Sequence, residues 1–103
     1  MGVVIESRPR STVVAPMSGK ILYANKFKNY GKLIIIEHKD GYHSLVAGLG
    51  KIDTVVGQVV IAGEPLGTLS VTSTQGGRPT LYYELRKNGK SVNPSKKLIG
   101  LKS

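Results

Sequence analysis

Apolar residues along the chain fall into short runs, and nowhere do they recur at helical spacing over ten or more positions. Val, Ile, Leu and Tyr alternate with Gly, Pro, Asn and Asp about every eight to twelve residues, which is typical of an all-β domain. The strands that we expect are Val3–Glu6, Thr12–Ala15, Gly19–Asn25, Leu33–His38, Tyr42–Gly48, Val59–Ile61, Pro65–Ser70, Leu81–Lys87 and Ser91–Val92.

Two tight hairpin turns are predicted, at Asp40-Gly41 and at Asn88-Gly89, because Gly accepts the positive φ that such turns require. The segment Ser70–Pro79 is polar and rich in Gly, so we expect a mobile loop of the kind that often borders a site. The tail from Asn93 onward has little to bury and should lie along the surface.

Length and composition favour one folded domain over residues 1–103, since 103 residues are too few for two cores and 40% are apolar. Fifteen Lys and Arg against six Asp and Glu give a net charge of +9, which favours acidic partners without choosing among them. The longest apolar run, Leu33–Ile36, is far too short to cross a bilayer, so no membrane insertion is expected. Residues 1–10 lack the apolar stretch of a signal peptide, and there is no Cys.

His38 and His43 flank the Asp40-Gly41 turn and suggest a metal site at first sight. Neighbouring residues on a strand point to opposite faces, however, and no second group of ligands completes a coordination sphere. The same alternation separates His43 from Ser44, the nearest base and nucleophile in sequence. The carboxylates are scattered singly, so we expect no catalytic residues, no metal ligands and no cofactor.

Basic residues interleaved with Phe27, Tyr30 and Tyr83 raise nucleic-acid binding as an alternative. No recognition helix, aromatic RNA-binding signature or zinc finger accompanies them. A basic surface on a β domain is commonly just solvated, so no nucleic-acid partner is expected.

The order and spacing of several segments resemble the LytM domain of lysostaphin-type zinc endopeptidases, a single β-sheet domain with a duplicated hybrid motif, hairpins and a groove. The matching segments are residues 13–21, 30–42, 55–67, 81–89 and 92–94. Gly77–Arg86 looks most like the corresponding stretch of EnvC-type murein hydrolase activators.

In active members of that family, the resemblance implies, zinc is held by a His-x-x-x-Asp motif and by the second His of a His-x-His motif. Val4 stands here at the Asp position, and Thr80-Leu81-Tyr82 replaces His-x-His. Gly48 takes the place of an assisting histidine, and the partner His would precede Met1. Val and Gly offer zinc no ligand, so the resemblance implies a degenerate metallopeptidase without peptidase activity.

What the resemblance implies instead is a non-catalytic activator of N-acetylmuramoyl-L-alanine amidases in the periplasm or cell envelope, acting in peptidoglycan remodelling and daughter-cell separation. The chain would then be a monomeric, C-terminal part of a longer protein, its signal peptide lying elsewhere. We expect Tyr82 to face the groove and Tyr83 the core, with Arg86 continuing the groove side. The expected partner-binding groove comprises Val4, Tyr30, Leu33, Val46, Gly48, Arg78, Tyr82 and Arg86.

Three other functions fit parts of the sequence. Ala15–Lys20 with Val59–Gly67 also looks like the hammerhead of biotinyl and lipoyl carriers, and Gly48–Val55 resembles a sugar-phosphotransferase phosphocarrier domain. A carrier needs a lysine at a hairpin tip and a phosphocarrier needs facing histidines, and both are missing. The remaining alternative is passive binding of peptidoglycan or another anionic polymer by the basic surface.

Overall fold

The computed structural model describes residues 2–71, 77–92 and 100–102, the last three by their backbone alone. The strands are β1 (Gly2–Glu6), β2 (Thr12–Val14), β3 (Gly19–Lys26), β4 (Lys32–Glu37), β5 (Tyr42–Ile52), β6 (Val59–Val60), β7 (Pro65–Leu69), β8 (Thr80–Lys87), β9 (Lys90–Val92) and β10 (Gly100–Lys102). Two short 3-10 turns, η1 (Lys28–Tyr30) and η2 (Lys39–Gly41), connect strands. Among the described residues no helix is long and apolar enough to cross a membrane.

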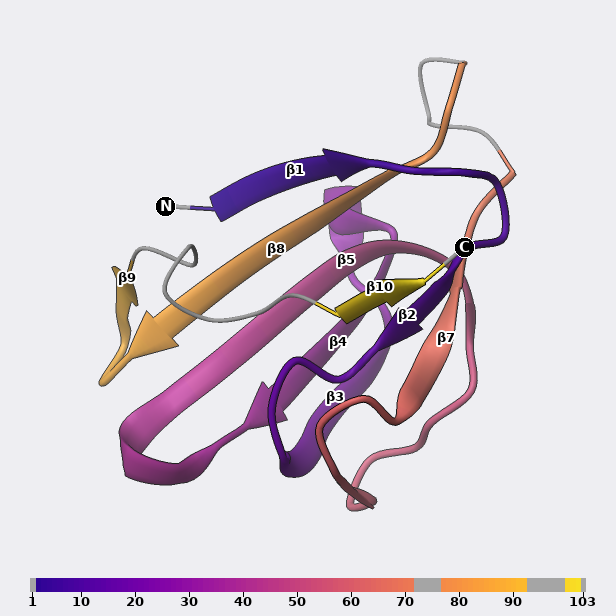
Figure 1. Cartoon of the computed structure of the whole chain (residues 1–103). Coiled ribbons are helices and arrows are strands. Elements are labelled where there is room, and N and C mark those ends of the chain that lie inside the picture. Colours follow the sequence, from indigo (N-terminus) through magenta and orange to yellow (C-terminus); the bar gives the residue numbers. More distant parts are fainter. Residues whose placement is uncertain (1, 72–76, 93–99, 103) are drawn as a thin grey trace.

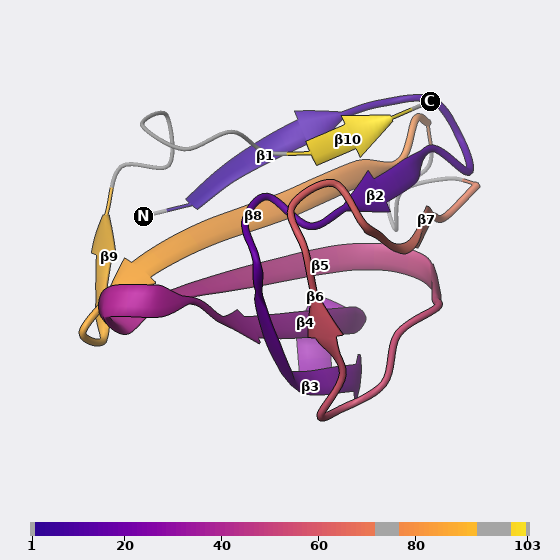
Figure 2. The same ribbon diagram turned by 60° about the horizontal axis from the view of Figure 1, so that its bottom comes forward.

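Strand β5 ties two groups of antiparallel strands into one sheet. Strands β1, β8, β5, β4 and β3 lie side by side in that order, with β6 beside β3 and β9 beside β8 (Figure 2). The second half of β5 pairs with β7, which continues through β2 to β10. Strands β2, β7 and β10 therefore lie across one face of the first group (Figure 1).

The hydrophobic core fills the space between these two groups. Strands β2 and β7 contribute Val13, Leu66 and Leu69, whose side chains are at most 2% exposed. They pack against alternate residues of β4, β5 and β8, because successive side chains of a strand point to opposite faces. These residues are Ile34, Ile36, Val46, Leu81, Tyr83 and Leu85.

A bulge at Gly48 lets β5 change partners. Lys32 pairs with Leu49 and Leu33 with Ala47, so Gly48 is the extra residue, and its φ is 98°. Pairing of β5 with β8 ends at Ala47, and pairing with β7 begins at Leu49. The bulge thus separates the half of β5 that carries the candidate site from the half that closes the core.

The expected all-β architecture and its hairpins are confirmed. The turn at Asp40-Gly41 has φ values of 60° and 78°, and that at Asn88-Gly89 has 51° and 84°. Strand β5 runs on to Ile52, beyond its expected end, because it finds β7 as a partner after the bulge. Strand β10 was not expected from the sequence. It lies in the tail that was expected to run along the surface, and it pairs with β2. The expected loop centre (72–76) and the first part of the tail (93–99) lie outside the described residues.

Candidate functional site

The face of the β1-β8-β5-β4-β3 group that points away from the core, called here the outer face, carries the candidate site. Its central row follows the strand register: Val4 is opposite Tyr82, Tyr82 is opposite Ala47, and Ala47 is opposite Leu33. The two positions that the resemblance assigned to metal ligands, Val4 and Tyr82, are therefore direct cross-strand neighbours. The expectation that Tyr82 faces away from the core and Tyr83 into it is confirmed, since Tyr83 is 0% exposed.

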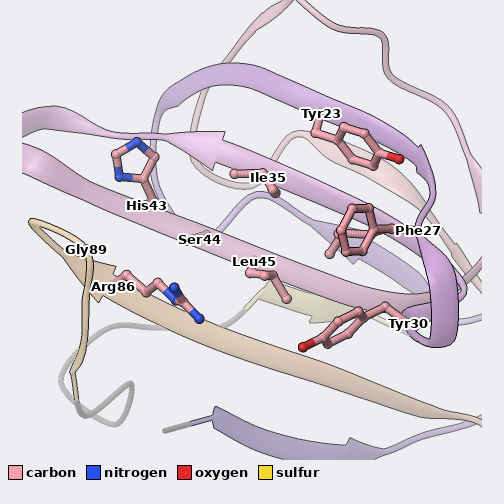
Figure 3. Close-up of a pocket in the computed structure, with 10 residues that line it drawn as sticks. Tyr23, Phe27, Tyr30, Ile35, His43, Ser44, Leu45, Arg86 and Gly89 are labelled. Atoms are coloured by element: carbon pink, nitrogen blue, oxygen red, sulfur yellow. The ribbon is translucent and has the colours of Figure 1, made fainter.

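Two hollows lie on the outer face, and Tyr30 lines both of them. The first, called the ligand-position hollow, has a volume of about 600 Å³ and is lined among others by Val4, Tyr30, Lys32, Ala47, Gly48 and Tyr82. The second, called the aromatic hollow, has a volume of about 440 Å³ and is shown in Figure 3. It is lined by Tyr23, Phe27, Tyr30, Leu33, Ile35, His43, Ser44, Leu45, Arg86 and Gly89.

A continuous row of aromatic rings joins the two hollows. Tyr23 and Phe27 meet edge to face with their centroids 5.9 Å apart, and Phe27 lies 6.0 Å from Tyr30. The Tyr30 ring lies in turn 6.4 Å from that of Tyr82. Such spacings are in the range at which rings attract one another beyond their buried area. The row begins on β3, passes over η1 and ends on β8, so segments distant in sequence hold it in place.

Alternate residues of β8 form a polar ladder beside this row. The Tyr82 hydroxyl donates to Glu84 Oε1 over 3.2 Å, and Arg86 Nε donates to Glu84 Oε2 over 3.1 Å. Burial raises the pKa of Glu84, but its hydrogen bond and charge interaction with Arg86, helped by Ser91 and Tyr82, lower it on balance. Burial and the negative charge of Glu84 raise the pKa of Tyr82. The ladder thus holds an ionised carboxylate and a neutral phenol.

The bulge at Gly48 has no room for a side chain. A Cβ built there would lie 2.5 Å from the Thr80 carbonyl oxygen, in a backbone conformation that residues with side chains rarely adopt. A histidine at this position would require the contact between β5 and β8 to shift. The fold therefore favours glycine at position 48, and this glycine in turn offers no side chain for catalysis or metal binding.

The residues at the positions that the resemblance assigns to metal ligands do not fit zinc. Val4 has no donor atom, Gly48 has no side chain, and the Tyr82 hydroxyl is engaged with Glu84 and resists ionisation. Glu84 itself is held by Arg86. Among the described residues there is no group of three or more His, Cys, Asp or Glu side chains arranged to hold a metal ion.

His38 occupies a structural position inside the fold. Its Nδ1 donates to the Ser18 carbonyl over 2.7 Å, so Nε2 is free to accept the Ser44 hydroxyl, also over 2.7 Å. Ser44 Oγ in turn accepts the Tyr83 hydroxyl over 3.0 Å. Burial lowers the pKa of His38 and so keeps its ring neutral, as this series of hydrogen bonds requires. His43, on the outer face, lies on the far side of the strand from Ser44 as the alternation predicted.

The structure brings together six of the eight residues expected in the groove. Val4, Tyr30, Gly48 and Tyr82 line the ligand-position hollow, and Tyr30, Leu33 and Arg86 line the aromatic hollow.

The other two residues are placed elsewhere. The prediction that Val46 lies in the groove is wrong. Its side chain is 2% exposed and belongs to the core, because it lies opposite Tyr83 of β8. Ala47 lies opposite Tyr82 instead. Arg78 is exposed and lines neither hollow.

Several residues of the aromatic hollow were not expected from the sequence. Ile35 and Leu45 are the alternating neighbours of Leu33 and Ala47, so strict period-two counting could have found them. Tyr23, Phe27 and His43 give no such signal, because their positions depend on how η1 folds back and on which strands pair.

Comparison with known protein families extends this picture. The model of peptidase family M23 matches residues 1–94. The chain belongs to peptidase family M23. The M23 domain is similar to the murein hydrolase activator EnvC of Escherichia coli K12, with 34% identity over 93 residues that make up 90% of this chain and 22% of EnvC.

Two further relatives share the same span. The murein hydrolase activator NlpD of E. coli K12 is 37% identical over 94 residues, covering 90% of this chain and 24% of NlpD. The outer membrane antigenic lipoprotein B of Haemophilus influenzae is 36% identical over 94 residues, covering 90% of this chain and 23% of the lipoprotein. The M23 domain therefore spans less than a quarter of the length of these relatives.

Solved structures place the fold beside a peptidase. The catalytic domain of the antimicrobial peptidase lysostaphin from Staphylococcus simulans superimposes with a TM-score of 0.80 at 25% identity, covering 92% of this chain and 75% of that domain. The relatives thus include both activators and peptidases, and the outer-face side chains of this M23 domain must decide between the two roles.

Proposed function

We propose that this M23 domain is a non-catalytic activator that binds a cell-wall N-acetylmuramoyl-L-alanine amidase in the groove left by the former active site. The observation that carries the proposal is the pairing of Val4 with Tyr82 at the former ligand positions. An aliphatic and an aromatic side chain face each other there, a pair suited to contacting a protein and unsuited to binding zinc. The similarity to EnvC and NlpD, both named as murein hydrolase activators, supports the same role.

The proposal extends to the setting of the domain. We place it in the periplasm or cell envelope, as a monomeric module near the C-terminus of a longer protein, with peptidoglycan as a second contact and no nucleic-acid partner. Two observations support this setting: the domain covers less than a quarter of the length of its relatives, and one of those relatives is an outer membrane lipoprotein. Fractionation of cells carrying an epitope-tagged chromosomal copy tests it, and a signal confined to the cytoplasm would overturn it.

A dye-release assay on labelled sacculi tests the activator function. The purified protein alone is expected to release no dye, with or without added Zn²⁺, and to accelerate release when an amidase of the same organism is present. Tyr82→Ala and Arg86→Ala should abolish the stimulation while leaving the circular-dichroism spectrum unchanged. Loss of such an anchor typically costs on the order of 2 kcal/mol of binding free energy or more.

Ile61→Ala is the matched control, because Ile61 is 66% exposed and lines neither hollow. It should stimulate as the wild type does. Clearance of sacculi by the protein alone, or failure to stimulate any amidase of the organism, would overturn the proposal.

The net charge of +9 favours a second candidate, passive binding of an anionic envelope polymer. Such binding would weaken steeply with salt, because exposed charges are screened beyond about 8 Å at physiological ionic strength. It would also survive Tyr82→Ala. Co-sedimentation with sacculi over a salt series therefore separates it from the activator function.

A further inference from the structure

The aromatic hollow is a preformed apolar site that the former ligand positions do not explain. Its walls are Tyr23, Phe27 and Tyr30, and its floor includes Leu33, Ile35 and Leu45. In Figure 3 the rings of Tyr23, Phe27 and Tyr30 surround one end, and Arg86 marks the other. A hollow with apolar walls and a few polar groups at one end is the usual form of a binding site.

Its walls are held in place before any partner arrives. The Tyr23 hydroxyl donates to the Lys26 carbonyl, the Phe27 amide donates to the Gly31 carbonyl over 2.8 Å, and the rings brace one another. Even so, Phe27 is 39% and Tyr30 48% exposed. Large rings that are fixed and yet exposed can bury area on binding at little cost in conformational entropy.

The charge around the hollow selects the partner's chemistry. The Arg86 side chain is 48% exposed although its Nε is bonded to Glu84, and Figure 3 shows the guanidinium directed along β8 toward Leu45 and Tyr30. Lys28 Nζ adds a second positive charge 5.8 Å from the Phe27 ring centroid. Glu84 is 9% exposed and already paired with Arg86. Glu37 is exposed opposite His43 but does not line the hollow, so the lining residues include Arg86 and no carboxylate.

We infer that the aromatic hollow binds an acidic, apolar segment of the partner protein, with one large apolar side chain between Tyr23, Phe27 and Tyr30 and a neighbouring carboxylate on Arg86. Naming that partner as an amidase rests on the proposed function, whereas the chemistry of the bound segment rests on the hollow itself. A carboxylate would meet the guanidinium in a charge-assisted hydrogen bond, and the apolar side chain would displace water from the ring surfaces.

Binding of a peptide segment would also use the position of Tyr30 in the walls of both hollows. Because its ring lines both hollows and lies against Tyr82, a segment seated in the aromatic hollow continues directly over the former ligand positions. Phe27 and Tyr23 thereby become specificity-determining residues outside the expected groove.

Selection from a random dodecapeptide library displayed on phage tests the inference without any amidase. The wild-type protein is expected to enrich sequences with a large apolar residue close to Asp or Glu. Arg86→Glu should reverse the charge preference toward Lys or Arg, and Phe27→Ala should weaken the best wild-type peptide at least about tenfold. Ile61→Ala serves as the control and should return the wild-type consensus.

Each variant is first checked for a wild-type circular-dichroism spectrum and melting curve. If the reversed charge beside Glu84 prevents folding, Arg86→Gln replaces it and should lose the acidic preference while keeping the apolar one. No enrichment, enrichment of basic peptides by the wild type, or an unchanged consensus with both arginine variants would overturn the inference. Binding of anionic sugar polymer in place of peptides would overturn it as well.

The amidase assay separates the two proposals. An acidic apolar consensus without amidase stimulation would leave the hollow's chemistry in place and remove the proposed function. Stimulation that survives Phe27→Ala unchanged would remove the hollow's role and leave the proposed function.

Discussion

Strand β8 presents two faces with different constraints. On the core face Leu81, Tyr83 and Leu85 are at most 1% exposed and pack against β2 and β7. On the outer face the side chains of Tyr82 and Arg86 are accessible to solvent, and both donate hydrogen bonds to Glu84. Residues that alternate along one strand are thus under two different constraints: those on one face must pack in the core, and those on the other are accessible to a partner.

The contrast separates the residues that form the core from the residues that line the two hollows. The core face depends on volume and shape, so its residues resist change. On the outer face Val4 and Tyr82 lie outside the core cluster and are accessible to solvent, although Leu33 and Ala47 of the same row are only 2% exposed. Substitutions at Val4 and Tyr82 should therefore disturb the core less than a substitution at Tyr83.

The largest expected effect comes from comparing two adjacent tyrosines. Tyr83→Ala opens a cavity in the core and leaves Ser44 without its hydroxyl partner, so we expect a loss of about 3–5 kcal/mol in the free energy of unfolding. Tyr82→Ala should cost no more than about 2 kcal/mol and yet abolish amidase stimulation. Urea unfolding followed by circular dichroism measures both.

Tyr83→Phe completes this comparison, since it keeps the ring and removes only the hydroxyl. Its cost should fall between those of the other two variants. Equal destabilisation by Tyr82→Ala and Tyr83→Ala would show that the two faces are not separable in the way that their burial indicates.

An intermediate effect is expected at the bulge that joins the two groups of strands. Gly48→Ala forces a side chain into a positive φ and against the Thr80 carbonyl, at a cost of roughly 1–3 kcal/mol. Gly57→Ala is the matched control, because Gly57 has a φ of 93° but nothing within 4 Å of an added Cβ. The difference between their melting temperatures isolates the contact with β8. Equal losses would mean that φ alone matters.

Much of the fold follows from the sequence because local rules govern it. Alternating apolar residues on β8 assign Tyr82 and Tyr83 to opposite faces, and Asp-Gly and Asn-Gly fix two turns. The extension of β5 to Ile52 does not follow, because it depends on the bulge at Gly48 and on a partner, β7, that is contributed from farther along the chain. Strand β10 depends likewise on pairing with β2, whose residues lie at the other end of the sequence.

The site was predictable to the extent that it lies on paired strands. Residues carried over from the family motif, such as Val4 and Tyr82, meet across the β1-β8 register. Val46 was misplaced because a resemblance gives positions along the chain and not the side of the strand. Phe27 was missed because η1 brings it over the sheet, an arrangement that no local pattern specifies.

The smallest expected effect sharpens the comparison of faces through the two histidines. His38 is buried on the core side with a lowered pKa, so between its unfolded pKa, near 6.5, and its folded pKa the unfolded state binds more protons. Stability contributed by neutral His38 should therefore be complete well above its unfolded pKa and decline as the pH falls through that value toward the lowered folded pKa.

Thermal melts at several pH values in this window measure the decline, which should be smaller than the loss caused by Gly48→Ala. His38→Gln should be less stable at neutral pH and nearly insensitive to pH across the window. His43→Gln, on the outer face, should keep most of the wild-type decline, because burial of His38, the largest cause of its shift, is unchanged. A decline that follows His43 instead would place the pH-sensitive group on the recognition face and contradict the division between the two faces of the sheet.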